Sequence, residues 1–174
     1  MSNALRISRL LLVLLAACAA SPPAKAPIPE ALVPAGQVAR ERLAAQGVQI
    51  YECRASQDAA AKAQWTFVAP EAALFDGAGR RVGKHFAGPR WEADDGSRIV
   101  GTVKARADAP QAGAIPWLLL TANAEGSAGR FSKMTSVQRI NTVGGVAPQA
   151  PCDAATLGSS VRVPYTADYI LLSP

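Results

Sequence analysis

The sequence has few of the side chains on which metal sites depend. It contains one histidine, His85, and three cysteines, Cys18, Cys53 and Cys152, among 174 residues. A zinc site needs three or four nitrogen, sulfur or oxygen ligands, and neither Cys53 nor Cys152 has another cysteine or a histidine at ligand spacing. We therefore expect no metal site.

Two catalytic signatures are also missing. The segment 77–79 (Gly-Ala-Gly) lacks the third glycine of a dinucleotide fingerprint and is not expected to open a helix, which argues against a nicotinamide cofactor. No Gly-x-Ser-x-Gly elbow selects a nucleophile from Ser97, Ser132 and Ser136. The sequence thus indicates no cofactor and no standard hydrolase motif.

Positive charge is modest and dispersed. The formal net charge is +5, and without Arg6 and Arg9 the chain has 16 basic and 13 acidic residues, a charge of +3. No block of lysine and arginine with interleaved aromatic residues is present, so nucleic acid is not an expected partner. The charge weakly favours an anionic lipid or polysaccharide.

The longest apolar run near the N-terminus is too short to span a bilayer. Leu10–Ala17 is eight residues long and follows Arg6 and Arg9, whereas a spanning helix needs about 20 residues. A charged start followed by a short apolar stretch is typical of a secretory signal. The sequence predicts a signal peptide at residues 1–17.

Residues 15–18 (Leu-Ala-Ala-Cys) resemble the bacterial lipobox. That resemblance implies a lipid on Cys18 and a bilayer as partner, and Ala19 in the next position favours the outer membrane, facing the periplasm or the surface. The alternative is an ordinary signal peptide cleaved near Ala20 or Ala24, with Cys18 discarded. Residues 18–34, rich in proline and alanine, are expected to form an extended tether, followed by one domain at residues 35–174.

With Cys18 assigned to lipid, Cys53 and Cys152 remain as a pair. An even number of cysteines in an oxidising, extracytoplasmic compartment favours a disulfide. Such a bond would close a loop of about 100 residues and stabilise the domain by about 4–5 kcal/mol. A free redox thiol and a metal ligand are the alternatives.

Most of the domain has the pattern of short strands. One helix is expected over Gln37–Gln46, because Val38, Arg42 and Ala45 share a helical face and Gly47 can end it. The expected strands are Val48–Cys53, Trp65–Val68, Arg81–Phe86, Arg98–Lys104, Ile115–Ala122, Phe131–Ile140, Val161–Val163 and Tyr165–Leu172. Asp-Gly and Gly-Gly turns separate them. We predict a mostly β fold, a single antiparallel β-sandwich or barrel domain with one short N-terminal helix.

The expected central strand is Ile115–Leu120, which is apolar on both faces. Tyr169–Leu172, the last strand segment, is also expected to be interior.

His85 is the main candidate for chemistry. It lies in a glycine-flanked segment, and a carboxylate from Glu92, Asp94 or Asp95 could orient it for proton transfer. The candidate catalytic set is His85, Glu92 and Asp95. The alternative is a structural histidine that holds a loop against the sheet.

A ligand site is a further possibility. Its candidates are Lys84, His85, Trp91, Arg139 and Asn141. The aromatic residues are candidates either for the lining of a pocket or for the core, and these are Trp65, Trp91, Trp117, Tyr51, Tyr165 and Tyr169.

Several segments together resemble the domain-of-unknown-function family 3455, whose members are secreted proteins of bacteria and fungi. The segments are Gly47–Cys53, Gly83–Glu92, Asp95–Ser97, Ile115–Leu120, Val137–Gly145 and Val163–Tyr169. The resemblance runs from about residue 35 to the C-terminus. It implies export, a single β-rich domain and retention of both domain cysteines, but no activity.

These observations favour a cell-envelope lipoprotein that acts as a non-enzymatic binding or structural module. Its partner beyond the bilayer would be an envelope polysaccharide, a peptide or a small molecule. The alternative is an extracytoplasmic hydrolase or lyase that uses His85 with a nearby carboxylate.

Overall fold

The computed structural model describes residues 26–56 and 63–174, and their regular secondary structure is almost entirely strand. A single 3-10 turn, η1 (Glu30–Leu32), comes first. The strands are β1 (Val38–Ala55), β2 (Ala63–Phe75), β3 (Arg81–Phe86), β4 (Arg90–Ala93), β5 (Ser97–Ala107), β6 (Trp117–Gly126), β7 (Ser136–Gly144) and β8 (Ser160–Ser173). The prediction of a mostly β fold is confirmed.

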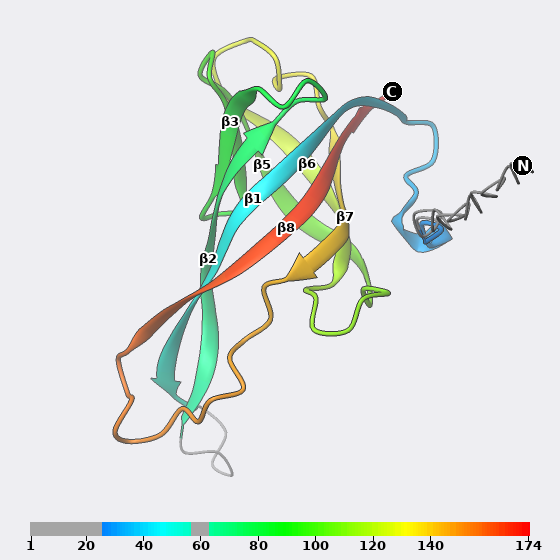
Figure 1. The fold of residues 1–174 in the computed structure, drawn as a ribbon. Helices are drawn as coiled ribbons and strands as arrows, with labels where there is room; N and C mark the ends of the chain where they lie inside the picture. The colour runs from blue at the N-terminus through cyan, green and yellow to red at the C-terminus, as the bar shows by residue number, and fades with distance from the viewer. Residues whose placement is uncertain (1–25, 57–62) are drawn as a thin grey trace, which may run out of the picture.

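The strands form one antiparallel sheet in which each strand pairs with the next along the chain. β1 also pairs with β8, so the order β1 to β8 closes into a barrel (Figure 1). At the lower end of Figure 1, β1, β2 and β8 extend well beyond the other strands. Closure gives every strand two neighbours and an inward and an outward face.

The helix predicted over Gln37–Gln46 is wrong, because Val38–Gln46 forms the first half of β1. Its residues favour a helix locally, but Leu43 and Ala45 are buried at alternate positions. The segment also pairs with β8 along its length and, from Ala44 onwards, with β2. Long-range pairing and burial of one face outweigh helix propensity, which is under 1 kcal/mol per residue for such side chains.

The predicted strands correspond to observed ones, with differences at their ends. Arg81–Phe86 coincides with β3, whereas β4 was not predicted because it is only four residues long. The segments Val161–Val163 and Tyr165–Leu172 form one continuous strand, β8. The predicted strand Phe131–Ile140 begins too early, because β7 starts only at Ser136. Phe131 is buried in the turn before β7.

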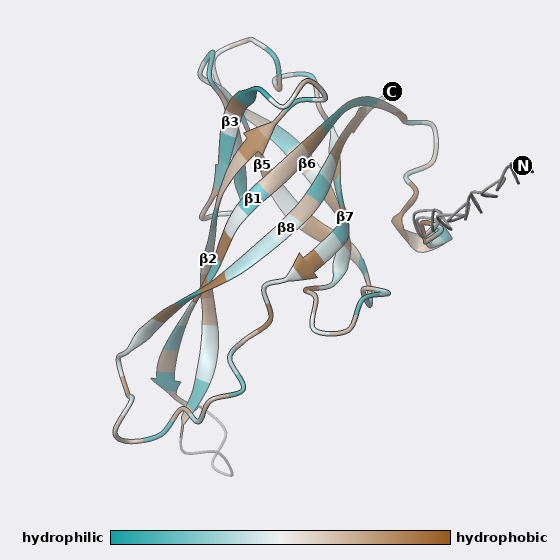
Figure 2. Ribbon diagram, in the orientation of Figure 1, coloured by the Kyte–Doolittle hydropathy of each residue, from teal (hydrophilic) through white to brown (hydrophobic). Residues whose placement is uncertain are grey.

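Side chains alternate between the barrel interior and its outer face, and Figure 2 shows the resulting bands of polar and apolar residues along the strands. The larger buried cluster occupies much of the interior and includes Leu43, Leu74, Trp91, Tyr165 and Tyr169. Trp91 and Tyr169 are nearly inaccessible. The interior is therefore packed largely by side chains from strands far apart in the sequence.

A second buried cluster lies outside the barrel, over β6, β7 and β8. Leu32 packs there against Trp117, Leu119, Ile170 and Leu172, and the Gln138 amide donates a hydrogen bond to the Leu32 carbonyl. This cover explains why β6 and the end of β8 are apolar on both faces, as the sequence predicted. Leu32, which the sequence assigned to the tether, is thus part of the folded unit.

No helix within residues 26–56 and 63–174 is long and apolar enough to cross a bilayer. The predicted signal peptide and Cys18 lie outside the described residues.

Candidate functional site

A cavity of about 570 Å³ lies inside the barrel around His85. All eight strands contribute to its wall. Its polar lining comes from Gln49, Tyr51, His85, Arg106, Arg139 and Tyr169. Its apolar and aromatic lining includes Phe67, Val68, Trp91, Val103, Ile115, Leu118 and Leu120.

The cavity lies where the short β3–β4 hairpin leaves the sheet incomplete. β3 pairs with β2 only over Ala72–Phe75, and β4 pairs with β5 only up to Val100. Beyond that hairpin, the remainders of β2 and β5 have no strand between them among the described residues. Their side chains Phe67, Val68 and Val103 line the cavity and are about half exposed, at 49%, 43% and 55%. These three residues form the mouth of the cavity.

His85 is buried at the inner wall, with 3% of its surface exposed. Its Nδ1 lies 2.8 Å from the Arg90 carbonyl oxygen, and its ring stacks on Trp91 at a centroid distance of 4.4 Å. Burial lowers the pKa of His85 from 6.5 to about 3, although the Arg90 carbonyl opposes this shift. The imidazole is therefore neutral, and because a carbonyl can only accept, Nδ1 carries the proton and Nε2 is an acceptor.

Tyr169 lines the cavity beside His85, and Tyr165 lies next to it in the core. The Tyr169 ring makes edge contacts with both His85 and Trp91, and its hydroxyl lies 3.3 Å from that of Tyr165. Burial is the main cause that raises the pKa of both phenols. Both tyrosines are consequently neutral hydrogen-bonding groups.

Arg139 brings a positive charge to the cavity. Its Nε and Nη2 donate to the Pro116 carbonyl at 3.1 and 2.9 Å, and none of the ion pairs among the described residues includes it. Tyr51 is fixed nearby by a 2.7 Å hydrogen bond from its hydroxyl to the Gly145 carbonyl. The Nε2 of Gln49, a residue only 2% exposed, has no hydrogen-bond partner in the described part of the chain.

The structure does not bring the predicted catalytic carboxylates to His85. Lys84 and Glu92 occupy outward positions next to the inward His85 and Trp91, and they pair with each other at 2.9 Å. Asp95 lies in the turn after β4, where its carboxylate accepts hydrogen bonds from Ser97 and from the Arg130 backbone. The structure therefore does not bring His85, Glu92 and Asp95 together in one site.

The same hydrogen bonds explain the acidity of these carboxyl groups. Bonds from Lys84 and then Arg98 lower the pKa of Glu92. The Ser97 hydroxyl is the main cause that lowers the pKa of Asp95 to about 2. Both groups are ionised structural residues. Asp94 also has a partner outside the cavity, since its Oδ1 lies 3.7 Å from Nη1 of Arg81.

Of the predicted ligand-binding residues, His85, Trp91 and Arg139 line the cavity and Lys84 and Asn141 do not. Asn141 has a positive φ of 51° at an irregularity of β7, and its amide donates to Asp168 at 2.6 Å. That contact supports a role in shaping β7. The prediction for Lys84 and Asn141 is corrected accordingly.

The chain was also compared with known proteins. The model of a family described as "Protein of unknown function (DUF3455)" matches residues 34–173. The chain belongs to this family. No curated protein and no solved structure matches it.

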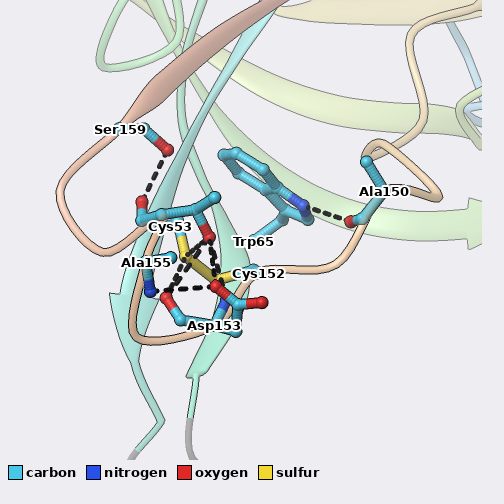
Figure 3. The surroundings of a disulfide bond; sticks show 8 residues. Cys53, Trp65, Ala150, Cys152, Asp153, Ala155 and Ser159 are labelled. Carbon is cyan, nitrogen blue, oxygen red and sulfur yellow. Dashed lines mark hydrogen bonds between the residues drawn. A yellow bond between two sulfur atoms is a disulfide. The ribbon is translucent and has the colours of Figure 1, made fainter.

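In this DUF3455 domain, Cys53 and Cys152 form a disulfide across 99 residues, as the cysteine count predicted. The bond fastens the segment between β7 and β8 to the far end of β1 (Figure 3). Close by, the Trp65 indole donates to the Ala150 carbonyl at 2.8 Å. The Cys53 N–H donates to the Ser159 carbonyl, and the Cys53 carbonyl accepts from the Gly158 N–H, both at 2.9 Å. The disulfide thus organises the extended end of the barrel and takes no part in the cavity lining.

The sequence missed Gln49 and Arg106 as site residues of the DUF3455 domain. Gln49 did have a signal, because it is a polar residue at an inward position between Ala45 and Tyr51 along β1. Of the six aromatic residues considered, Tyr51, Trp91 and Tyr169 line the cavity, while Trp117 belongs to the outer cluster.

Proposed function

We propose that this chain is an exported lipoprotein of the cell envelope whose barrel is a container for a small ligand. In this proposal a lipid on Cys18 holds the chain at a membrane, with the outer membrane favoured. The barrel faces the periplasm or the surface and binds its ligand without chemical change.

The observation that carries this proposal is the cavity at His85. Its volume of about 570 Å³ falls within the range of about 300–1,000 Å³ that is usual for small-molecule sites. Its lining is mostly apolar, with a few convergent polar groups from Gln49, Tyr51, His85, Arg139 and Tyr169. Such a lining suits a compact organic molecule better than a polysaccharide chain or a folded protein.

The electrostatics at His85 support binding over catalysis. A general base works best with a pKa near the operating pH, whereas burial holds the pKa of His85 at about 3. The carboxylates expected to assist it pair with Lys84 and Arg98 or with turn residues instead. The imidazole is thus suited to accepting a hydrogen bond at Nε2 from a ligand.

The mouth of the cavity allows a direct test. The chain from Ala19 onwards would be exported behind a cleavable signal peptide so that the disulfide can form. Titration with the neutral dye Nile red is expected to give saturable binding to one site, followed by its visible fluorescence. The double variant Val68→Trp/Val103→Trp places two indoles across the mouth and is expected to weaken binding about tenfold or more, equivalent to about 1.4 kcal/mol.

The matched control is Val38→Trp/Val143→Trp. These two valines are exposed to the same degree, 52% and 44%, but lie away from the cavity. The control is expected to bind Nile red as the parent does. Absence of saturable binding, or equal affinity in both double variants, would refute the container. Turnover of an envelope substrate by the parent chain, lost in His85→Ala, would instead support a hydrolase or lyase.

A further inference from the structure

The charge distribution inside the cavity is one-sided. Arg106 and Arg139 line it, and no aspartate or glutamate does. His85 is neutral there, because burial keeps its pKa low. The cavity is therefore positively charged at neutral pH, and this charge is balanced by no acidic residue of its own wall.

These two arginines differ from the others in the described part of the chain. Eight arginines there form ion pairs with a carboxylate, namely Arg42, Arg54, Arg80, Arg81, Arg90, Arg98, Arg130 and Arg162. Arg106 and Arg139 have no such pair among the described residues, and Arg40 instead bonds Ser173 and the Pro174 carbonyl. Arg139 is also half-buried. A charge removed from water without a counter-ion is costly, so a partner of opposite charge at this position would be favourable.

The charge of Arg139 acts on the other polar groups of the cavity. Burial is the largest cause that raises the pKa of Tyr51 and Tyr169, and Arg139 opposes it at both phenols. At His85, burial lowers the pKa and Arg139 lowers it further. These shifts agree with the geometry, in which one guanidinium faces the same enclosed space as all three groups.

A second donor supports the same kind of ligand. The Nε2 of Gln49 is buried without an acceptor among the described residues, and a buried donor left unpaired is destabilising. Arg139 and Gln49 Nε2 are both donors, so they require acceptor atoms on the ligand. A carboxylate or phosphate presents several such atoms and matches the planar fork of an arginine.

The rest of the wall suits an apolar body. Leu118 and Leu120 line the inner part, and Phe67, Val68 and Val103 line the mouth. Burial of apolar ligand surface against these side chains removes it from water and is favourable. The apolar part of a ligand would supply most of the affinity, and the anionic head would set its orientation.

We infer that the cavity selects an anion with an apolar body, whose head group pairs with Arg139 and whose apolar part extends towards the mouth between β2 and β5. This inference rests on the proposed container function. It names the class of ligand, of which a medium-chain fatty acid and an alkyl phosphate are the simplest members.

The test compares ligands that differ only in their head group. Decanoate, decyl phosphate, decan-1-ol and decyltrimethylammonium would each displace Nile red from the same exported chain. One or both anions are expected to displace the dye at concentrations about tenfold lower than the alcohol or the cation, which corresponds to one charge-assisted pairing. Which anion displaces better distinguishes a free carboxylate from a phosphate.

The decisive variant is Arg139→Met, which keeps much of the length of the side chain and removes its charge. It is expected to reduce the preference for anions to less than about twofold, because only the Coulomb and hydrogen-bond contribution is lost. Arg162→Met is the matched control, since it removes the same charge from an outward position paired with Glu71. The far-UV circular dichroism spectrum and the unfolding temperature of Arg139→Met would show that the variant is folded.

The outcomes separate the two proposals. Equal displacement by all four ligands would overturn the anion preference and leave the container intact. A lack of Nile red binding by the parent chain would overturn the container itself. If Arg139→Met does not fold, the salt dependence of the parent chain still tests the inference. Binding of the anion by the parent chain is expected to weaken when the salt concentration rises from about 0.05 to about 0.5 M. Binding of the anion that is independent of salt would contradict the inference.

Discussion

Acidification is expected to destabilise this protein through His85 alone between pH 8 and pH 5. The imidazole is buried and neutral, with its pKa lowered from 6.5 to about 3. Below pH 6.5 the unfolded chain therefore binds a proton that the folded chain does not. The stabilisation is complete above that pH and is lost progressively as the pH falls towards 3.

The size of the effect follows from the pKa in the unfolded state. At pH 5 the solution is 1.5 units below 6.5, and each unit corresponds to about 1.4 kcal/mol. The free energy of unfolding should therefore be about 2 kcal/mol lower at pH 5 than at pH 8 because of this residue. Such a loss is a large fraction of the stability of a typical domain, which is about 5–15 kcal/mol.

The window from pH 5 to pH 8 isolates His85 well. It is the only histidine in the chain. Carboxyl groups with lowered pKa, such as Asp95 and Glu92, also stabilise the folded state at neutral pH, but their contribution is lost only as the pH falls below their ordinary values of 3.8 and 4.5. These groups therefore change little in the window.

Urea unfolding of the parent chain and of His85→Phe, each at pH 8 and pH 5, measures the effect. A phenyl ring can still stack on Trp91 but cannot titrate or bond to the Arg90 carbonyl. The variant is expected to be less stable than the parent by about 1–3 kcal/mol at pH 8. It should lose about 2 kcal/mol less than the parent on acidification, so the difference between the two chains should nearly disappear at pH 5. An equal loss in both chains would falsify the assignment of a buried neutral histidine.

Two further predictions concern the cysteines. The double variant Cys53→Ala/Cys152→Ala is expected to lose about 4–5 kcal/mol of stability in urea unfolding, because the unfolded chain regains the freedom of a long loop; a loss below about 1 kcal/mol would contradict that reasoning. In the full chain, Cys18→Ser is expected to abolish the incorporation of labelled palmitate and to release the protein from the membrane fraction, since a lipid on this residue is its proposed anchor. A variant that remains labelled and bound to membranes would show that the anchor lies elsewhere.

The local pattern of the sequence predicted much of the fold. Alternation with period two identified most of the strands, as at Arg81–Phe86, because one face of each strand must be buried. The apolar run at Ile115–Leu120 correctly indicated a strand covered on both sides. The failure at Gln37–Gln46 has a physical cause, since Ala, Arg, Glu and Gln favour a helix locally and only pairing with β2 and β8 makes the segment a strand.

The sequence by itself determined the β class, the family resemblance and the pair Cys53 and Cys152, because each depends on local pattern or on residue count. The site depended on the tertiary structure. His85 and Glu92 are close in the sequence, yet the register of β3 and β4 places them on opposite faces of the sheet. Gln49 and Arg139 are far apart in the sequence, and both line one cavity because closure of the barrel turns their inward faces towards the same space.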